Sequence, residues 1–235
     1  MRHWLKQLYQ ICFPNTCILC ASHSTLNIDL CKPCLKDFPH SQFTCKQCAN
    51  TLCVAADKCA DCLTKIPPFR QTFSLFDYAL PVNYLLSQLK FNERFAVTPI
   101  FSELLYQKIK YDWYADNPLP QVIIPVPLHL ARLKQRGFNQ AFELIKPLEK
   151  RLGLPIDTQS VRRVKNTLPQ AKVDLKTRYA NLQGAFELTR PCRYTHIALF
   201  DDVVTTGNTV MALAKLFSAA GVKTIDILCC AKTQR

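Results

Sequence analysis

The chain has 235 residues, and its 49% hydrophobic and 20% charged residues are ordinary values for a globular protein. This composition excludes a disordered chain, and no apolar run approaches the roughly 18 residues of a membrane span. Two excesses stand out, 13 cysteines and a net charge of +13. Ten of the cysteines lie in the first 62 residues. We therefore predict a cysteine-rich domain over residues 1–66 and a second domain over residues 67–235.

Eight of the early cysteines form four Cys-x-x-Cys pairs, and successive pairs begin 14 residues apart. Two sulfurs separated by two residues can bind one metal ion, and two pairs complete a tetrahedral Cys₄ site. The sequence therefore predicts two structural zinc ions. Sequential pairing is the simplest arrangement, although the equal spacing also permits an interleaved one. The predicted ligands are Cys17, Cys20, Cys31 and Cys34 for one ion and Cys45, Cys48, Cys59 and Cys62 for the other.

A disulfide framework is the alternative interpretation of these cysteines. It needs an oxidising compartment, and the start MRHWLKQLYQICF lacks the continuous apolar core of a secretory signal. We therefore favour zinc and a cytoplasmic location. Cys12 and Cys53 fit no pair, so each is either a buried thiol or a replacement ligand.

After Pro67 and Pro68 the sequence alternates between predicted strands and helices. The predicted strands cover 69–78, 121–124, 197–200 and 225–229, and the predicted helices cover 82–110, with a break near Pro99, 141–152 and 210–220. Such alternation predicts an α/β fold with a mostly parallel sheet flanked by helices. In sheets of this kind, ligands bind beyond the carboxyl ends of the strands.

Two carboxylates, Asp201 and Asp202, follow the predicted strand at 197–200 and precede a loop that leads into a helix. Paired carboxylates can accept hydrogen bonds from vicinal hydroxyls, or hold Mg²⁺ together with ligand phosphates. A helix amino terminus favours a phosphate, although a plain helix cap is the structural alternative. Together these features predict a ribose 5-phosphate site. The predicted phosphate loop consists of Thr205, Thr206, Gly207, Asn208 and Thr209.

A second candidate region follows the strand at 121–124. Pro125 and Val126 begin a stiff turn, where we expect a diphosphate to meet backbone N–H groups. Arg132 and Arg136 would add charge-assisted hydrogen bonds to that diphosphate. The residues at 138–140 are either an ordinary helix start capped by Asn139 or part of the ligand site.

The stretch 197–209 resembles the phosphoribosyl diphosphate (PRPP) signature of the type I phosphoribosyltransferases. Asn208 is a departure, because that family usually has a smaller residue there. Further motifs occur in order: PVPLH at 125–129, RGFNQ at 136–140, TLPQ at 167–170 and RYANLQGAF at 178–186. After a cysteine-rich head, this order resembles the ComF family of competence proteins. The resemblance implies a double zinc ribbon, a phosphoribosyltransferase-like domain, and PRPP bound with Mg²⁺ and the acidic pair on the ribose hydroxyls.

Positive charge is concentrated in one part of the chain, since residues 129–190 carry +8 of the net +13. A small diphosphate needs roughly two or three cations, so the surplus predicts a nucleic acid, with a solvated basic face as the alternative. Aromatic residues beside cations at 69–70 and 90–95 would suit stacking with single-stranded bases, although most are expected in the core. The candidate DNA contacts are Arg162, Arg163, Lys165, Lys172, Lys176 and Arg178.

Three functions are compatible with these features. The ComF resemblance implies a protein that handles incoming single-stranded DNA during natural transformation, and we predict this function. An active phosphoribosyltransferase would move ribose 5-phosphate from PRPP to an acceptor. Only six residues follow Cys229, so its hood would come from the head or from residues 67–110. A non-catalytic scaffold that recruits a DNA translocase is the third possibility.

Overall fold

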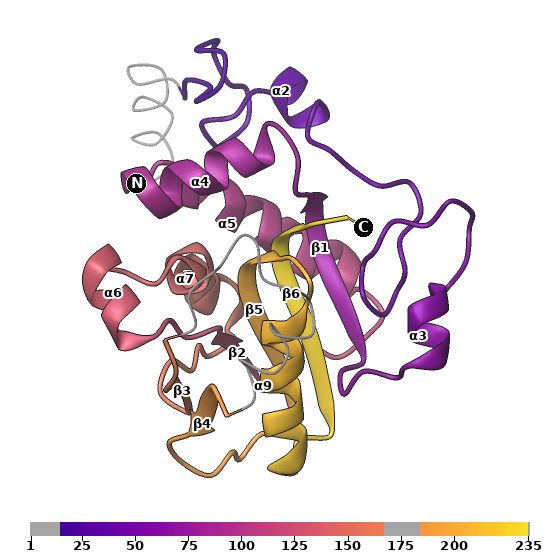
Figure 1. Cartoon of the computed structure of the whole chain (residues 1–235). Coiled ribbons are helices and arrows are strands. Elements are labelled where there is room, and N and C mark those ends of the chain that lie inside the picture. The colour runs from indigo at the N-terminus through magenta and orange to yellow at the C-terminus, as the bar shows by residue number, and fades with distance from the viewer. Residues whose placement is uncertain (1–14, 167–183, 235) are drawn as a thin grey trace.

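The computed structural model describes residues 15–166 and 184–234, and its centre is a sheet of four parallel strands in the order β1–β6–β5–β2 (Figure 1). Each strand of this sheet is paired in parallel with its neighbour, and their carboxyl ends therefore meet at one edge. The strands are β1 (Gln71–Asp77), β2 (Val122–Pro125), β5 (His196–Val204) and β6 (Thr224–Lys232).

Helices cover both faces of the sheet, so the predicted α/β architecture is confirmed. Phe200 and Leu228 pack on one face against α4 (Val82–Asn92), α5 (Val97–Lys108) and α7 (Gln140–Leu152). Leu199 and Ile227 pack on the other face against α9 (Asn208–Ala219). A hairpin of β3 (Val161–Arg163) and β4 (Phe186–Leu188) lies beside α9, and α6 (Leu130–Arg136) follows β2. Of the helices within the described ranges, none combines the length and apolar character that crossing a membrane requires.

The helix predicted over 82–110 consists of two helices, and the break lies upstream of the predicted position. α4 ends at Asn92, because Glu93 adopts the left-handed conformation with φ 52°. α5 begins at Val97, which leaves Pro99 in its first turn. The missing N–H of proline costs no intrahelical hydrogen bond there, so Pro99 starts this helix and does not break it. A π-helical turn, η1 (Ile109–Trp113), continues α5.

The cysteine-rich head packs directly on the rest of the chain (Figure 1). Its first half, with α2 (Lys32–Lys36), contributes Leu30 and Phe38 to the core beneath α4 and α5. Its second half, with α3 (Ala60–Thr64), borders the edge strand β1, where the Thr72 N–H donates to the Lys46 carbonyl at 3.4 Å. The packing is therefore continuous across residue 66, and the domain boundary stays a prediction.

Candidate functional site

The eight predicted metal ligands gather into two groups with the sequential pairing. Within each group the four Sγ atoms lie within 4.8 Å of one another. Zn–S bonds of about 2.3 Å in a tetrahedron require sulfurs about 3.8 Å apart, whereas a disulfide is about 2.05 Å long. The Sγ atoms of Cys20 and Cys31 are 3.6 Å apart, and those of Cys48 and Cys59 are 3.7 Å apart. The groups therefore fit zinc, and the disulfide and interleaved alternatives are wrong for these eight residues.

The two cysteine groups have the same backbone geometry, as the internal repeat predicts. The Ala21 N–H donates to the Cys17 carbonyl at 2.9 Å, and the Ala49 N–H donates to the Cys45 carbonyl at 2.8 Å. Both alanines adopt the left-handed conformation, with φ near 59° and 58°. These turns aim both sulfurs of a pair at one point, which is typical of a closed structural site. Cys53 is exposed and outside both groups, and Cys12 lies outside the described residues.

The acidic pair lies inside β5 and not after it, since pairing with β6 continues to Val204. The sequence placed the end of this strand too early because carboxylates usually mark exposed positions. Asp202 is instead only 2% exposed. Successive side chains of a strand point to opposite faces, so Asp201 and Asp202 have different surroundings.

Asp202 is held by side chains from two helices. Lys90 of α4 places its Nζ 2.5 Å from Oδ2 of Asp202, and the Gln140 amide of α7 donates to Oδ1 at 3.2 Å. Burial alone would lower the pKa of Lys90, but the charge of Asp202 outweighs it and raises the pKa above its ordinary value. The pair is therefore an ion pair at neutral pH, and it ties α4 and α7 to the carboxyl edge of the sheet.

Asp201 has the opposite electrostatic character. Burial and, secondly, the negative charge of Asp202 raise the pKa of Asp201 to about 8. The Asp202 N–H donates to Oδ1 of Asp201 at 3.0 Å. Asp201 is therefore largely protonated at neutral pH, and its carboxyl group can both donate and accept a hydrogen bond.

The predicted phosphate loop leads from β5 into α9. Gly207 begins the helix with φ 78°, a conformation that side chains disfavour, and it offers no side-chain cap. The N–H groups of the first helical turn therefore lack intrahelical partners. Lys232 at the end of β6 donates from Nζ to the Thr205 carbonyl at 2.9 Å, which fixes the loop and adds positive charge beneath it.

Three arginines lie around the same edge. Arg136 donates from Nη1 to Oε1 of Gln140 at 2.6 Å, so it is linked through that amide to Asp202. Burial lowers the pKa of Arg136, the charge of Asp202 opposes this shift, and repulsion from Arg132 adds to it. Burial and then the charge of Arg132 also lower the pKa of Arg163, whose strand is bridged to His129. Arg136 and Arg163 therefore lie within electrostatic range of the acidic pair, and Arg132 lies within range of both arginines; their role in binding a diphosphate stays a prediction.

The turn after β2 does not offer the backbone donors that the sequence led us to expect. Pro125 and Pro127 have no N–H, and the Val126 N–H donates to the Phe200 carbonyl at 2.8 Å. Asn139 donates to the Val126 carbonyl at 3.0 Å and also caps α7, because its Oδ1 accepts from the Ala141 N–H. The turn therefore positions α6 and α7.

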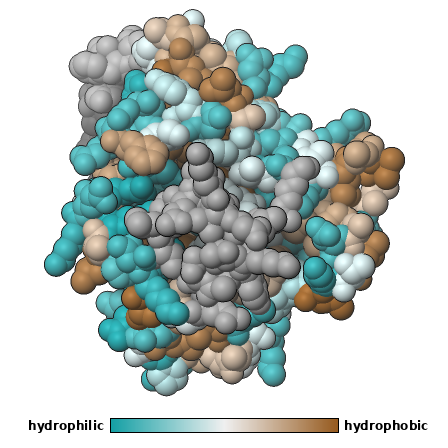
Figure 2. All heavy atoms as spheres, viewed as in Figure 1, coloured by the Kyte–Doolittle hydropathy of each residue, from teal (hydrophilic) through white to brown (hydrophobic). Residues whose placement is uncertain are grey.

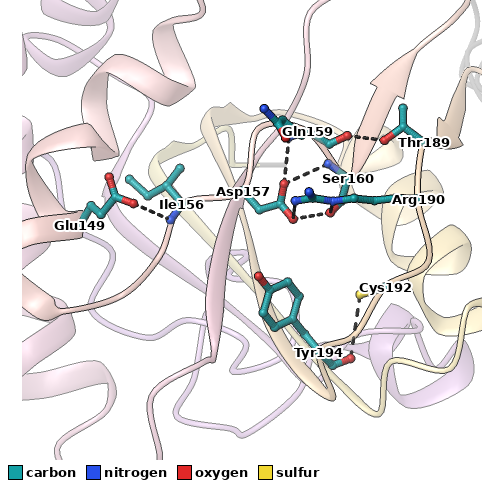
Figure 3. A network of polar contacts seen from close by, with 9 residues as sticks. All are labelled: Glu149, Ile156, Asp157, Gln159, Ser160, Thr189, Arg190, Cys192 and Tyr194. Carbon is teal, nitrogen blue, oxygen red and sulfur yellow. Dashed lines mark hydrogen bonds and ion pairs between the residues drawn. The ribbon is translucent and has the colours of Figure 1, made fainter.

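A buried carboxylate anchors the hairpin that carries Arg163 (Figure 3). Asp157 accepts the N–H groups of Gln159 and Ser160 at 2.8 and 2.9 Å, and Arg190 pairs with it at 3.0 Å. This network fixes the start of β3 and the end of β4. Among the other candidate DNA contacts, Arg162 is largely exposed beside Glu187. Lys172, Lys176 and Arg178, together with the motif at 167–170, lie outside the described residues.

The aromatic residues that flank cations divide into buried and exposed groups. Phe69 is buried, and Arg70 binds Asp226 at the opposite edge of the sheet. Phe91 is 74% exposed, and the guanidinium of Arg136 lies 5.7 Å from the centre of its ring. In Figure 2 the surface near α6 is mostly hydrophilic, whereas hydrophobic residues gather near α3, where Ile66 is 82% exposed. An exposed aromatic ring beside an arginine is suited to base stacking.

Three contacts at this edge were not predicted, those of Lys90, Gln140 and Lys232. Lys90 and Lys232 occur in apolar helix and strand patterns, where a lysine is the unusual residue, and this was the available signal. Gln140 belongs to the RGFNQ motif, but the sequence does not reveal its contact with Asp202, which is 62 positions away.

The parallel sheet, the acidic pair in β5 and the loop into α9 define a phosphoribosyltransferase-like protein, joined here to two Cys₄ ribbons. No family model matches the chain. It is 34% identical to the DNA utilization protein YhgH of Salmonella typhi, over 94% of this chain and 98% of that protein. It is also 34% identical to Competence protein F of Haemophilus influenzae, over 84% of this chain and 88% of that protein. The chain therefore belongs to the ComF family of DNA utilization and competence proteins.

Proposed function

We propose that this chain binds PRPP or a related phosphoribosyl ligand at the carboxyl edge of its sheet, binds single-stranded DNA beside it, and handles incoming DNA during natural transformation. The charge of the edge is the observation that carries the proposal, because cations outnumber carboxylates there. Asp201 and Asp202 are accompanied by Lys90, Arg132, Arg136, Arg163 and Lys232. The names of the relatives support a role with DNA.

The ligand groups match different parts of the edge. A 5-phosphate fits the amino terminus of α9, where backbone N–H groups, the helix dipole and Lys232 all favour an anion. The ribose hydroxyls fit Asp201, which can accept one hydrogen bond and donate another while it is protonated. A diphosphate fits the guanidinium groups of Arg132 and Arg136, which form strong hydrogen bonds with phosphate oxygens.

Magnesium is expected from the family resemblance, and the acidic pair is the place to test the fit. Mg²⁺ requires oxygen ligands with free lone pairs in near-octahedral geometry. Both oxygens of Asp202 already have partners, Lys90 and Gln140, and Asp201 favours its neutral form. The acidic pair therefore does not fit Mg²⁺, and any magnesium that accompanies PRPP would be bound to the ligand phosphates.

Single-stranded DNA is the second proposed ligand. Its backbone would follow the basic surface formed by α6 and the β3–β4 hairpin, where Arg132 and the exposed Arg162 lie. Phe91 would stack with a base, supported by the guanidinium of Arg136. Because phosphate contacts release counterions, DNA affinity should fall steeply between low salt and about 0.2 M salt.

Calorimetric titration with PRPP tests the ligand site. The Asp201→Ala variant is expected to bind PRPP at least about tenfold more weakly, since it loses hydrogen bonds to the ribose hydroxyls. Asp116→Ala is the matched control, because Asp116 is exposed and lies on the loop before β2. Wild-type affinity in the Asp201→Ala variant, or no PRPP binding by the wild type, would overturn the proposal.

Diphosphate release from PRPP, measured with a panel of bases and amines, separates a binding protein from a transferase. We expect no release above the background without protein, because the proposed role is to bind and handle DNA. Turnover that the Asp201→Ala variant loses would instead establish the transferase function. A DNA translocase partner would be supported by co-purification that depends on the exposed ribbon residues near α3.

A further inference from the structure

We propose that Lys90 is the built-in cation of the phosphoribosyl site, and that the site binds its ligand without a metal ion on the protein carboxylates. The inference rests on the proposed function of the same edge. In this site the ammonium group of Lys90 supplies the positive charge that a divalent cation would otherwise supply next to paired carboxylates.

The first argument comes from the oxygen atoms of Asp202. Oδ2 lies 2.5 Å from Nζ of Lys90, and Oδ1 accepts from the Gln140 amide at 3.2 Å. Gln140 is itself held by Arg136, which donates to its Oε1 at 2.6 Å. A metal ion on Asp202 would have to displace the lysine from a carboxylate that is 3% exposed, and it would then face the ammonium group at close range.

The second argument comes from the position of Lys90 itself. Its side chain is 20% exposed, and its neighbours Leu86 and Leu89 are buried in the core. The side chain is therefore anchored in the core at its base and partly exposed along its length. It has three N–H donors, so an ion pair with Asp202 leaves capacity for a ligand hydroxyl or phosphate oxygen.

The third argument comes from Asp201. The raised pKa of about 8 keeps this carboxyl group mostly neutral at pH 7, and its Oδ1 accepts the N–H of Asp202. A protonated carboxyl group is a poor ligand for a hard divalent cation. Burial, the charge of Lys90 and the hydrogen bonds of Gln140 thus leave the acidic pair arranged for hydroxyl groups.

The test is a titration of the full zinc-loaded chain with PRPP and with ribose 5-phosphate, each with and without Mg²⁺. Divalent ions are removed from the buffers beforehand, and no chelator is added, because a chelator would extract metal from the Cys₄ groups. We expect ribose 5-phosphate to bind with the same affinity, within about threefold, in both conditions. Repeated titrations can resolve a change in affinity of about threefold. The loss of one charge-assisted hydrogen bond to the ligand would change the affinity by more than that.

The Lys90→Gln variant removes the positive charge, and the Lys90→Arg variant, which keeps it, is the control. Removing the cation should weaken metal-free binding of ribose 5-phosphate at least about tenfold, and Lys90→Arg should restore most of it. Lys90→Gln should also gain a Mn²⁺ site, detected as paramagnetic broadening of the amide signals of Gly207 and Asn208. A role limited to packing α4 would change thermal stability but neither the Mg²⁺ dependence nor the broadening.

The outcomes separate this inference from the proposed function. Binding by the wild type only when Mg²⁺ is present, or Mn²⁺ broadening of Gly207 in the wild type, would overturn the role of Lys90 and leave the proposed function intact. Failure of both ligands to bind in either condition would overturn the proposed function. If Lys90→Gln does not fold, the wild-type Mg²⁺ and Mn²⁺ measurements still decide.

Discussion

The two ends of the central sheet each bury an aspartate next to a cation, but the surroundings of the two carboxylates differ. At the amino end, Asp226 has no exposed surface and accepts hydrogen bonds from Nε and Nη2 of Arg70 at 2.9 and 2.6 Å. The Tyr114 hydroxyl donates to the same carboxylate at 2.8 Å, and His196 Nε2 lies 2.9 Å from it. This carboxylate is fully satisfied by the protein itself.

At the carboxyl end, Lys90 pairs with Oδ2 of Asp202 and Gln140 donates to Oδ1, and Arg136 and Arg163 lie within electrostatic range of the acidic pair. Burial is the main cause that lowers the pKa of Arg136 and of Arg163; repulsion from Arg132 adds to it in both, and the charges of Asp202 and Asp201 respectively oppose it. The comparison shows that a buried ion pair by itself indicates a structural role and not a ligand site. Cations that repel one another at the end of a sheet indicate a ligand that carries the opposite charge.

The largest expected effect concerns the two ribbons, of which the first packs beneath α4 and α5 and the second borders β1. We predict two zinc ions per chain by elemental analysis, and one in the Cys45→Ser variant. Cys53→Ser is the control, because that thiol is exposed and outside both groups. Loss of a structural zinc site removes on the order of 10 kcal/mol of binding free energy, so Cys45→Ser should unfold the second ribbon. Equal zinc content in the two variants would contradict the assignment.

At the amino end, the Asp226→Asn variant removes the ion pair with Arg70 and leaves this partly buried arginine without a counter-ion. Breaking a buried pair in this way typically costs about 3–5 kcal/mol, and Arg70 is partly exposed, so the lower end is expected. The free energy of unfolding from a urea titration measures this cost. Affinity for PRPP should remain unchanged, measured on folded protein. A large loss of affinity with little loss of stability would reverse the roles assigned to the two ends.

The carboxyl end can be tested through the pH dependence of stability. The pKa of Asp201 is raised from 3.8 to about 8, so the folded protein favours the neutral carboxyl group. The stability contributed by this neutral group is fully present below pH 3.8 and is lost as pH rises through about 8. The Asp201→Asn variant has no carboxyl group to ionise, so its melting temperature relative to the wild type should rise between pH 5 and pH 8.5. Asp116→Asn, at an exposed position on the loop before β2, is the control variant. A melting-temperature difference between Asp201→Asn and the wild type that does not change with pH would show that burial does not perturb Asp201.

The smallest expected effect concerns Phe91 at the rim of the carboxyl end. Stacking of one base with an aromatic ring contributes about 1–3 kcal/mol, so Phe91→Ala should weaken binding of a labelled single-stranded oligonucleotide by about fivefold or more. The change in slope with salt should be small, because no phosphate contact is removed. Ile66→Ala is the control, since Ile66 is also largely exposed but lies directly after α3, away from this edge. Equal losses in both variants would argue against a specific stacking platform.

Local patterns in the sequence predicted the features that depend on neighbouring residues. The Cys-x-x-Cys spacing predicted the eight metal ligands but left their pairing open, and the order of strand, carboxylates and loop located Asp201 and the start of α9. The sequence did not predict contacts between distant segments. Arg70 and Asp226 are 156 positions apart, and the pairing of Lys90 with Asp202 depends on how α4 packs over the sheet. A lysine in an apolar helix shows that a partner exists, but it does not show which one.

The account is tested most directly by comparing the two ends of the sheet in one nuclear magnetic resonance titration of the zinc-loaded chain with PRPP. We predict that the amide signals of Gly207 and Asn208 shift progressively with ligand concentration, because the first turn of α9 binds the 5-phosphate. The signals of His196 and Asp226 should stay in place, since that end is already neutralised. Shifts at His196 and Asp226 without shifts at Gly207 and Asn208 would contradict the central claim.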